Sequence, residues 1–177
     1  MSEERPEPGS SWLQLGQLKA GWQTVSFELA GERFEFNVSY LENSPLHELT
    51  TAALWLLVPD YGDEHELLAP PNKNPPLSGP GYRCIHFLRE PEWHPLKVNR
   101  LCSDEIQAEF FVRHEGWAGI READLQTAER RVVSQMQLRD FCEAVSLATQ
   151  QTNVPMHNTN WGQYPTKFAS TLYSLLH

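Results

Sequence analysis

The chain has 177 residues, of which 40% are hydrophobic and 21% charged, the composition of an ordinary globular domain. Its 23 acidic and 14 basic residues give a formal net charge of −9, which argues against nucleic acid or an anionic membrane as the partner of its surface. Composition predicts a disordered lead over residues 1–11, rich in Glu, Pro, Ser and Gly, and a single domain over residues 12–177.

Neither a signal peptide nor a membrane helix is expected. The first residues are acidic, and the longest apolar run, Ala52 to Val58, is far shorter than the roughly 20 residues that span a bilayer. Cys84, Cys102 and Cys142 are odd in number and widely spaced in apolar settings, which predicts buried free thiols. These features predict a cytoplasmic protein.

A β-hairpin followed by a helix is predicted between residues 21 and 58. Apolar and polar residues alternate from Val25 to Leu29 and again from Phe34 to Tyr40, and Gly31 lies between the two runs, where a turn is needed. The helix begins near Pro45, with Asn43 or Ser44 as its N-cap, and ends before Pro59. Residues 12–18 upstream are compatible with either a short strand or an irregular arm.

Residues 60–81 form the longest irregular segment. They begin with an acidic patch, and five prolines between positions 69 and 80 exclude a helix interior or a central strand. Loops of this length in a compact domain are usually functional or disordered.

Four strands are expected next, with a turn at Trp93 and His94 between Pro91 and Pro95. The strand segments are 82–88, 96–100, 104–113 and 130–136, while residues 122–128 are ambiguous. Helical spacing then predicts a helix from about Leu138 to Thr152 and a final one from Pro165. Short connections between strands favour an antiparallel sheet with helices packed on one face, which is a two-layer α+β domain.

No catalytic motif is present in the sequence. The seven histidines lack metal-ligand spacing, and neither a nucleophile elbow nor a phosphate-binding glycine loop occurs, so we expect no cofactor and no metal. Glu105 and Glu109 share one strand face, and His86 and His94 could meet across a hairpin. These four side chains are the remote candidates for an enzyme.

Partner contacts are expected at acidic and aromatic side chains in turns and loops, which can pair with basic groups and anchor interfaces. The alternatives are a solvated loop for the acids and lids over the core for the aromatics. The predicted contact residues are Asp60, Tyr61, Asp63, Glu64, Glu66, Trp93 and Trp117.

The segments Val38–Leu41 and Ser44–Leu49, the apolar helix Ala52–Leu57 and the helix Leu138–Val145 together resemble a group of small bacterial proteins. These include the immunity proteins encoded beside secreted polymorphic toxins, and the resemblance covers most of residues 21–152.

The resemblance implies a non-enzymatic inhibitor that binds one cognate toxin with a basic cleft in the cytosol and occludes its active site. The alternatives are a small adaptor domain in a secretion or phage-related assembly and an enzyme without a recognisable motif. The sequence leaves the oligomeric state undetermined.

Overall fold

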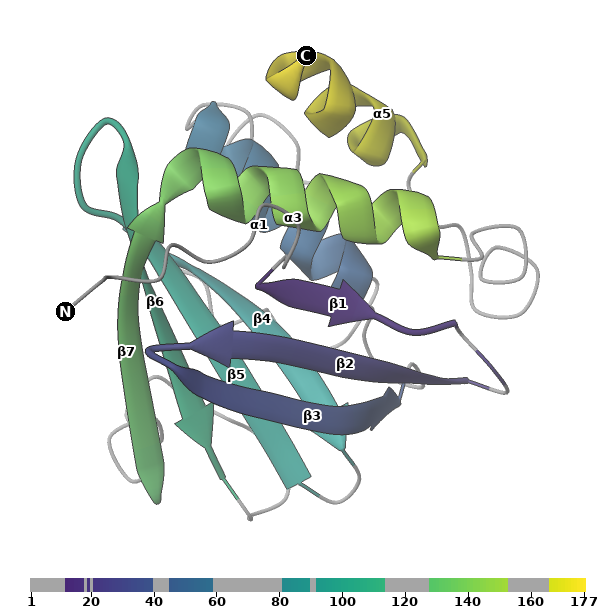
Figure 1. Ribbon diagram of the computed structural model, residues 1–177, viewed down its shortest axis with the longest axis vertical. Coiled ribbons are helices and arrows are strands. Elements are labelled where there is room, and N and C mark those ends of the chain that lie inside the picture. Colours follow the sequence, from purple (N-terminus) through teal and green to yellow (C-terminus); the bar gives the residue numbers. More distant parts are fainter. Residues whose placement is uncertain are drawn as a thin grey trace, which may run out of the picture.

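In the part of the chain that the computed structural model describes, the elements form two antiparallel sheets and three helices (Figure 1). The α+β class and the antiparallel pairing predicted from the sequence are confirmed, although the strands divide into two sheets where one was expected. The structure describes residues 12–17, 19, 21–39, 45–58, 81–89, 92–113, 128–152 and 166–177, so the expected N-terminal lead lies outside the described residues.

The first sheet has the order β1-β2-β3 and contains the predicted hairpin. Strands β2 (Trp22–Leu29) and β3 (Glu32–Ser39) are joined by Ala30 and Gly31, whose φ angles of 52° and 77° suit a two-residue hairpin turn with both central residues left-handed. The short strand β1 (Leu13–Leu15) pairs with β2. Of the two alternatives predicted for residues 12–18, a short strand or an irregular arm, the strand is therefore correct.

The second sheet contains β4 (Arg83–Arg89), β5 (Glu92–Arg100), β6 (Glu105–Val112) and β7 (Arg130–Gln137) in that order. All four predicted strands are present. The turn predicted at Trp93 and His94 is wrong, because both residues belong to β5 and pair with β4.

Strand β5 tolerates Pro95 because of the register of its two neighbours. Pro95 lies opposite His86, whose backbone N–H points away from β5 and donates to Glu48. By antiparallel geometry, the Pro95 nitrogen must then point towards β6. The β5–β6 ladder begins one residue later, at Leu96 opposite Phe110, so Pro95 lies at the end of this ladder, where its missing N–H costs at most one terminal bond.

The core lies between the two sheets, where a cluster of rings joins them. Phe27 of β2 lies 4.8 Å from Phe110 of β6 and 5.7 Å from Phe87 of β4, measured between ring centroids. Phe36 of β3 contacts Phe87 at 5.6 Å and His94 at 5.5 Å. Apolar side chains that alternate along each strand therefore meet at one interface, as the period-two pattern predicts.

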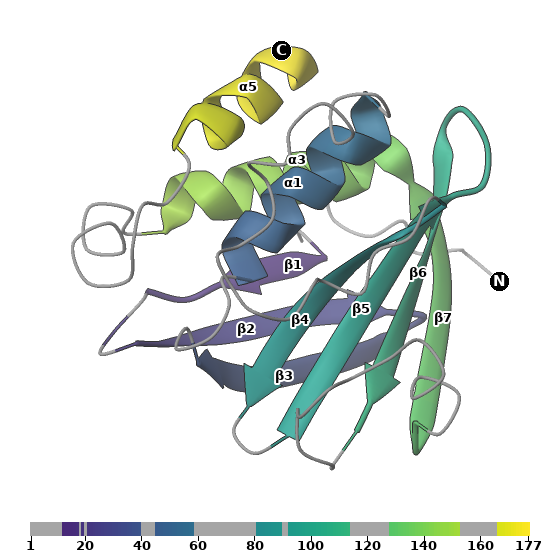
Figure 2. The ribbon, with the colours of Figure 1, turned by 180° about the vertical axis from the view of Figure 1, so that it is seen from behind.

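Three helices lie together beside one end of the sheets (Figures 1 and 2). Helix α1 (Pro45–Leu57) contacts the edge strand β4, and helix α3 (Leu138–Gln151) contacts α1, β1 and β7. Helix α5 (Thr166–Leu176) packs on both α1 and α3. All three were predicted, but the helices meet both sheets where the prediction placed them on one face of a single sheet.

Shortening Phe110 to alanine tests the importance of the ring cluster. Phe110 is 1% exposed and contacts rings of both β2 and β3, so we expect Phe110→Ala to lower the free energy of unfolding by about 3–5 kcal/mol in urea denaturation. The control Val133→Ala, at a site 42% exposed, should change it by less than about 0.5 kcal/mol. Similar losses in the two variants would contradict this assignment of the core.

Candidate functional site

Most of the predicted contact residues lie outside the described residues: Asp60, Tyr61, Asp63, Glu64, Glu66 and Trp117. Trp93 is described, and its prediction as a surface contact is wrong, because its side chain is 0% exposed. Trp93 is buried because it belongs to a strand. It pairs with β4, and its side chain points to a buried face of the sheet. The alternative of a loop aromatic that covers the core as a lid does not describe Trp93 either, because this residue lies within β5.

Trp93 is part of a buried group of polar and aromatic side chains. The imidazole of His86 stacks on its ring with centroids 5.4 Å apart and planes 12° apart, and the Arg113 guanidinium lies 5.5 Å from the ring. Within the described residues, the indole Nε1 has no hydrogen-bond partner. The cation and the aromatic face attract each other, so this contact stabilises the charge of a buried arginine.

Glu48 of α1 binds the edge of the second sheet. Its Oε2 accepts a hydrogen bond of 2.6 Å from the backbone N–H of His86 and lies 3.1 Å from His86 Nδ1, and both side chains are buried. The carboxylate thus satisfies a donor that an edge strand would otherwise leave without a strand partner. A sequence signal for this contact existed, because Glu48 falls on the apolar face of α1, between Pro45 and Ala52.

The four candidate catalytic side chains do not come together. His94 faces the ring cluster, since it pairs with Phe87, whereas His86 lies on the opposite face of the sheet. His94 Nδ1 accepts a hydrogen bond of 3.2 Å from the backbone N–H of Arg113. Each histidine therefore has a structural contact, and the meeting across a hairpin does not occur.

The two glutamates on β6 have different surroundings. Glu109 is buried and accepts hydrogen bonds from Arg131 Nε and Nη2 at 2.8 and 2.5 Å, while Glu105 is exposed at the start of the strand. The Glu109 carboxylate is thus paired with the Arg131 guanidinium. The two glutamates therefore do not form an acid–base pair, because they do not face a common position at which a substrate could bind.

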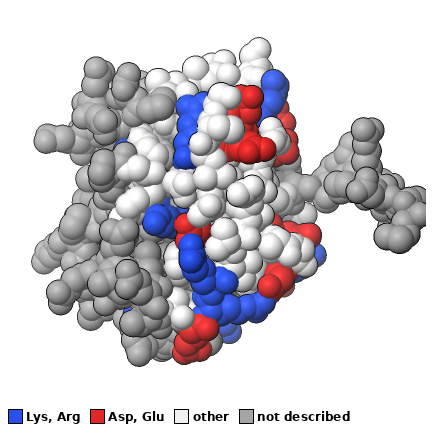
Figure 3. All heavy atoms as spheres, turned by 90° about the vertical axis from the view of Figure 1, so that its left-hand side faces the viewer, with Lys and Arg blue, Asp and Glu red and all other residues white. Residues whose placement is uncertain are grey.

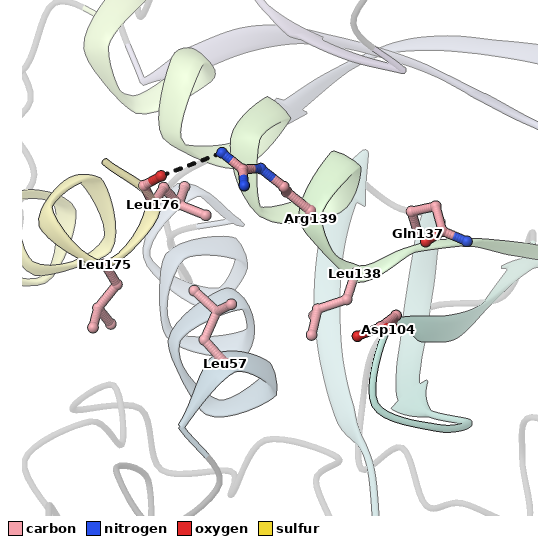
Figure 4. Close-up of a pocket in the computed structure, with 7 residues that line it drawn as sticks. All are labelled: Leu57, Asp104, Gln137, Leu138, Arg139, Leu175 and Leu176. Carbon is pink, nitrogen blue, oxygen red and sulfur yellow. Dashed lines mark hydrogen bonds between the residues drawn. The ribbon is translucent and has the colours of Figure 1, made fainter.

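Within the described residues, a hollow of about 370 Å³ lies where α1, α3 and α5 approach the loop between β5 and β6. This volume lies at the low end of the range of ligand pockets, roughly 300–1,000 Å³. Figure 4 shows Leu175 and Leu176 on one side, Asp104 and Gln137 on the other, and Leu57 and Leu138 between them. The lining combines leucines with three polar side chains: Leu57, Leu138, Leu175, Leu176, Asp104, Gln137 and Arg139.

The charges of the hollow come from Arg139 and Asp104. Arg139 Nε donates to Glu143 at 2.6 Å, and Nη2 lies 3.5 Å from the carbonyl oxygen of Leu176 (Figure 4). The hydrogen bond to Glu143, and then the opposite charge of that carboxylate, raise the pKa of Arg139 above its ordinary value. Asp104 lies across the hollow from Arg139 (Figure 4), and the Asp104 backbone oxygen accepts a hydrogen bond of 2.7 Å from the Leu138 N–H.

Sequence reasoning missed this hollow, because its lining residues are brought together only by tertiary packing. Leu172 and Leu175 lie three residues apart on α5, but Leu172 is 0% exposed and Leu175 is 48% exposed. Part of the apolar lining of the hollow is therefore accessible to another molecule.

None of the three cysteines, all of them described, forms a disulfide. Cys84 and Cys142 are buried as predicted, whereas Cys102 is exposed, which corrects the prediction for that residue. Burial raises the pKa of the Cys142 thiol to about 12, and Sγ lies 3.7 Å from the Ala53 carbonyl oxygen. Cys142 is therefore protonated near neutral pH, the opposite of what a nucleophilic cysteine needs.

Within the described ranges, no three His, Cys, Asp or Glu side chains gather as a metal site would require. Among the described helices, none is both long and apolar enough to cross a membrane.

The chain matches no known protein family, no curated protein and no solved structure. An α+β architecture by itself specifies no activity, because unrelated functions share folds.

Glu48 is expected to support the edge of the second sheet. Glu48→Ala removes the acceptor of the His86 N–H and should lower the free energy of unfolding by about 2–4 kcal/mol, with a smaller loss for Glu48→Gln, which keeps an oxygen. Amide exchange at His86 should accelerate in the alanine variant. The control Glu143→Ala breaks an exposed ion pair, worth at most about 1 kcal/mol. Equal losses at positions 48 and 143 would refute the role of Glu48.

Cys142 should make stability depend on alkaline pH. The unfolded thiol ionises near its ordinary pKa of 9.0 while the folded one keeps its proton to about 12, so this stabilisation is present below pH 9 and is lost as the pH rises. Between pH 8 and 10 the wild type should lose about 1.4 kcal/mol more than Cys142→Ala in urea denaturation. Cys102→Ala, which removes an exposed thiol, should behave like the wild type, and a parallel decline in all three proteins would disprove the effect.

Proposed function

We propose that this protein is a non-enzymatic inhibitor of the immunity type, which binds one basic protein toxin and occludes its active site. The observation that supports this most is the position of the hollow. Leu57 at the end of α1 lines it, and the acidic patch 60–66 starts three residues later. Three residues span at most about 11 Å, so covalent geometry keeps an apolar hollow and an acidic segment within reach of one partner.

The distribution of charge also supports a basic partner. The described residues hold eleven of the 23 acidic and eleven of the 14 basic residues, which leaves twelve acidic against three basic in the remainder. Figure 3 shows acidic and basic side chains interspersed on one face of the described part. The net charge of −9 therefore belongs to the rest of the chain, which consists of residues 1–11 and the segments between the described elements, including the acidic patch.

Such segments suit recognition of a cationic cleft. Several acidic side chains close together attract an oppositely charged partner over about 10 Å at physiological salt, which accelerates encounter and rejects acidic proteins. A toxin that acts on nucleic acid or nucleotides needs a basic cleft for its own substrate. The resemblance to immunity proteins supplies this identity for the partner, and the absence of disulfides among the three described cysteines supports an encounter in a reducing cytosol.

The test is recovery of the partner from the source cell with the tagged full chain at low and high salt. We expect one stoichiometric basic protein that high salt elutes, and whose toxicity in a host cell is suppressed when the two are produced together. A partner that is not toxic, a toxin that is not neutralised, or a protein that only self-associates would overturn the proposal.

Charge reversal of the acidic patch should slow this association. Asp60→Lys, Asp63→Lys and Glu64→Lys in one variant are expected to lower the association rate constant about tenfold or more at low ionic strength and to flatten its salt dependence, measured by stopped-flow or surface binding. Glu28→Lys, Glu35→Lys and Glu129→Lys change the net charge equally at exposed sites of the sheets. If this control slows association as much as the patch variant, long-range charge and not the patch governs the encounter.

A further inference from the structure

The hollow beside α1, α3 and α5 has two kinds of wall. Leu57, Leu138 and Leu175 supply an apolar surface, and the Asp104 carboxylate faces it from the loop between β5 and β6 (Figure 4). Leu175 is 48% exposed, so part of the apolar wall is accessible to another molecule. A suitable occupant combines an aliphatic part with a polar end.

The local charges favour a cationic end. Around the hollow, in the loop and the start of α3, four acidic residues stand against two basic ones: Asp104, Glu105, Asp140 and Glu143 against Arg100 and Arg139. Both arginines already have acceptors. Arg139 binds Glu143, and Arg100 donates to the carbonyl oxygens of Cys102 and Ser103 at 3.0 and 2.6 Å.

The helix ends add to this balance. Helix α1 ends at Leu57 and α5 ends at Leu176, so the negative ends of two helix dipoles lie at the hollow, and neither helix has a basic residue in its last turn. The positive end of α3 also begins there, but Asp140 in its first turn offsets it. An anion would therefore meet net repulsion, whereas a cation would be stabilised.

We propose that the hollow receives a basic side chain of a protein partner, with arginine as the best fit. Its methylene groups would lie against Leu57, Leu138 and Leu175, and its guanidinium would bind the Asp104 carboxylate, for which two parallel hydrogen bonds are the preferred geometry. This inference rests on the proposed function, and it places one anchor of the partner at a defined position on the described part of the chain.

The inference is tested on the full chain without the partner, with n-butylguanidinium as the probe. In methyl NMR spectra, the resonances of Leu57, Leu138 and Leu175 should shift and saturate with the probe in the millimolar range. Butanol and butyrate, which keep the chain length but lack the positive charge, should give clearly weaker binding. Equal shifts with butyrate or butanol, or the absence of saturation with the cation, would overturn the inference.

A pair of adjacent variants checks the role of the carboxylate. Asp104→Asn should weaken binding of n-butylguanidinium about three- to tenfold, because it removes the charge from a partly exposed pair. Glu105→Gln neutralises the neighbouring exposed acid, which does not line the hollow, and should therefore change the affinity much less. Equal effects at the two positions would overturn the assignment to Asp104. Both side chains are exposed, and matching thermal unfolding of the two variants would confirm that they fold.

The two proposals can fail separately. If the probe does not bind while a toxin is captured and neutralised, the hollow is not the anchor and the inhibitor function stands. If the probe binds as expected but the captured partner is not a toxin, the site for a basic side chain stands and the inhibitor function is wrong.

Discussion

The packing of Phe27 and Phe36 against Phe87 and Phe110 is the interaction on which the rest of this structure depends. It joins the two sheets through rings whose centroids lie 4.8–6.1 Å apart, and burial of such rings is the largest stabilising contribution that single side chains can make. The helices then close one end of this core, where Trp12 stacks on Phe141 of α3 at 5.1 Å. Because the ring cluster fixes the sheets relative to each other, the helix ends around the hollow also take fixed positions.

The edge of the second sheet shows how a polar contact can be as specific as the apolar core. Pro95 is accommodated only in a register that turns the His86 N–H outward, and Glu48 reaches from α1 to accept that donor. Register and helix position therefore depend on each other: a one-residue slip would turn the His86 N–H towards β5 and leave the buried carboxylate without this donor. One carboxylate thereby selects the placement of a helix on a strand, which apolar contacts alone specify less sharply.

Much of the fold could be predicted from local patterns, and the candidate site could not. Alternation identified β2, β3 and β6, and helical spacing identified α1, α3 and α5, because each pattern reports one face of one element. Trp93 was misplaced because flanking prolines indicate a turn, while the register that admits Pro95 is a property of three strands together. The hollow escaped prediction for a similar reason: Leu57, Asp104, Leu138 and Leu175 are distant in sequence and meet only through tertiary packing.

Charge and packing are divided in this protein between different parts of the chain. The described sheets and helices balance their charges through ion pairs such as Arg131 with Glu109 and Arg130 with Glu32, so this scaffold contributes little long-range field. The acidic surplus lies outside this scaffold, in residues 1–11 and in the segments between the described elements. Under the proposed function this division has a use, since charged segments would accelerate encounter while the Asp104 carboxylate at the rim of the hollow would discriminate among the cations that arrive.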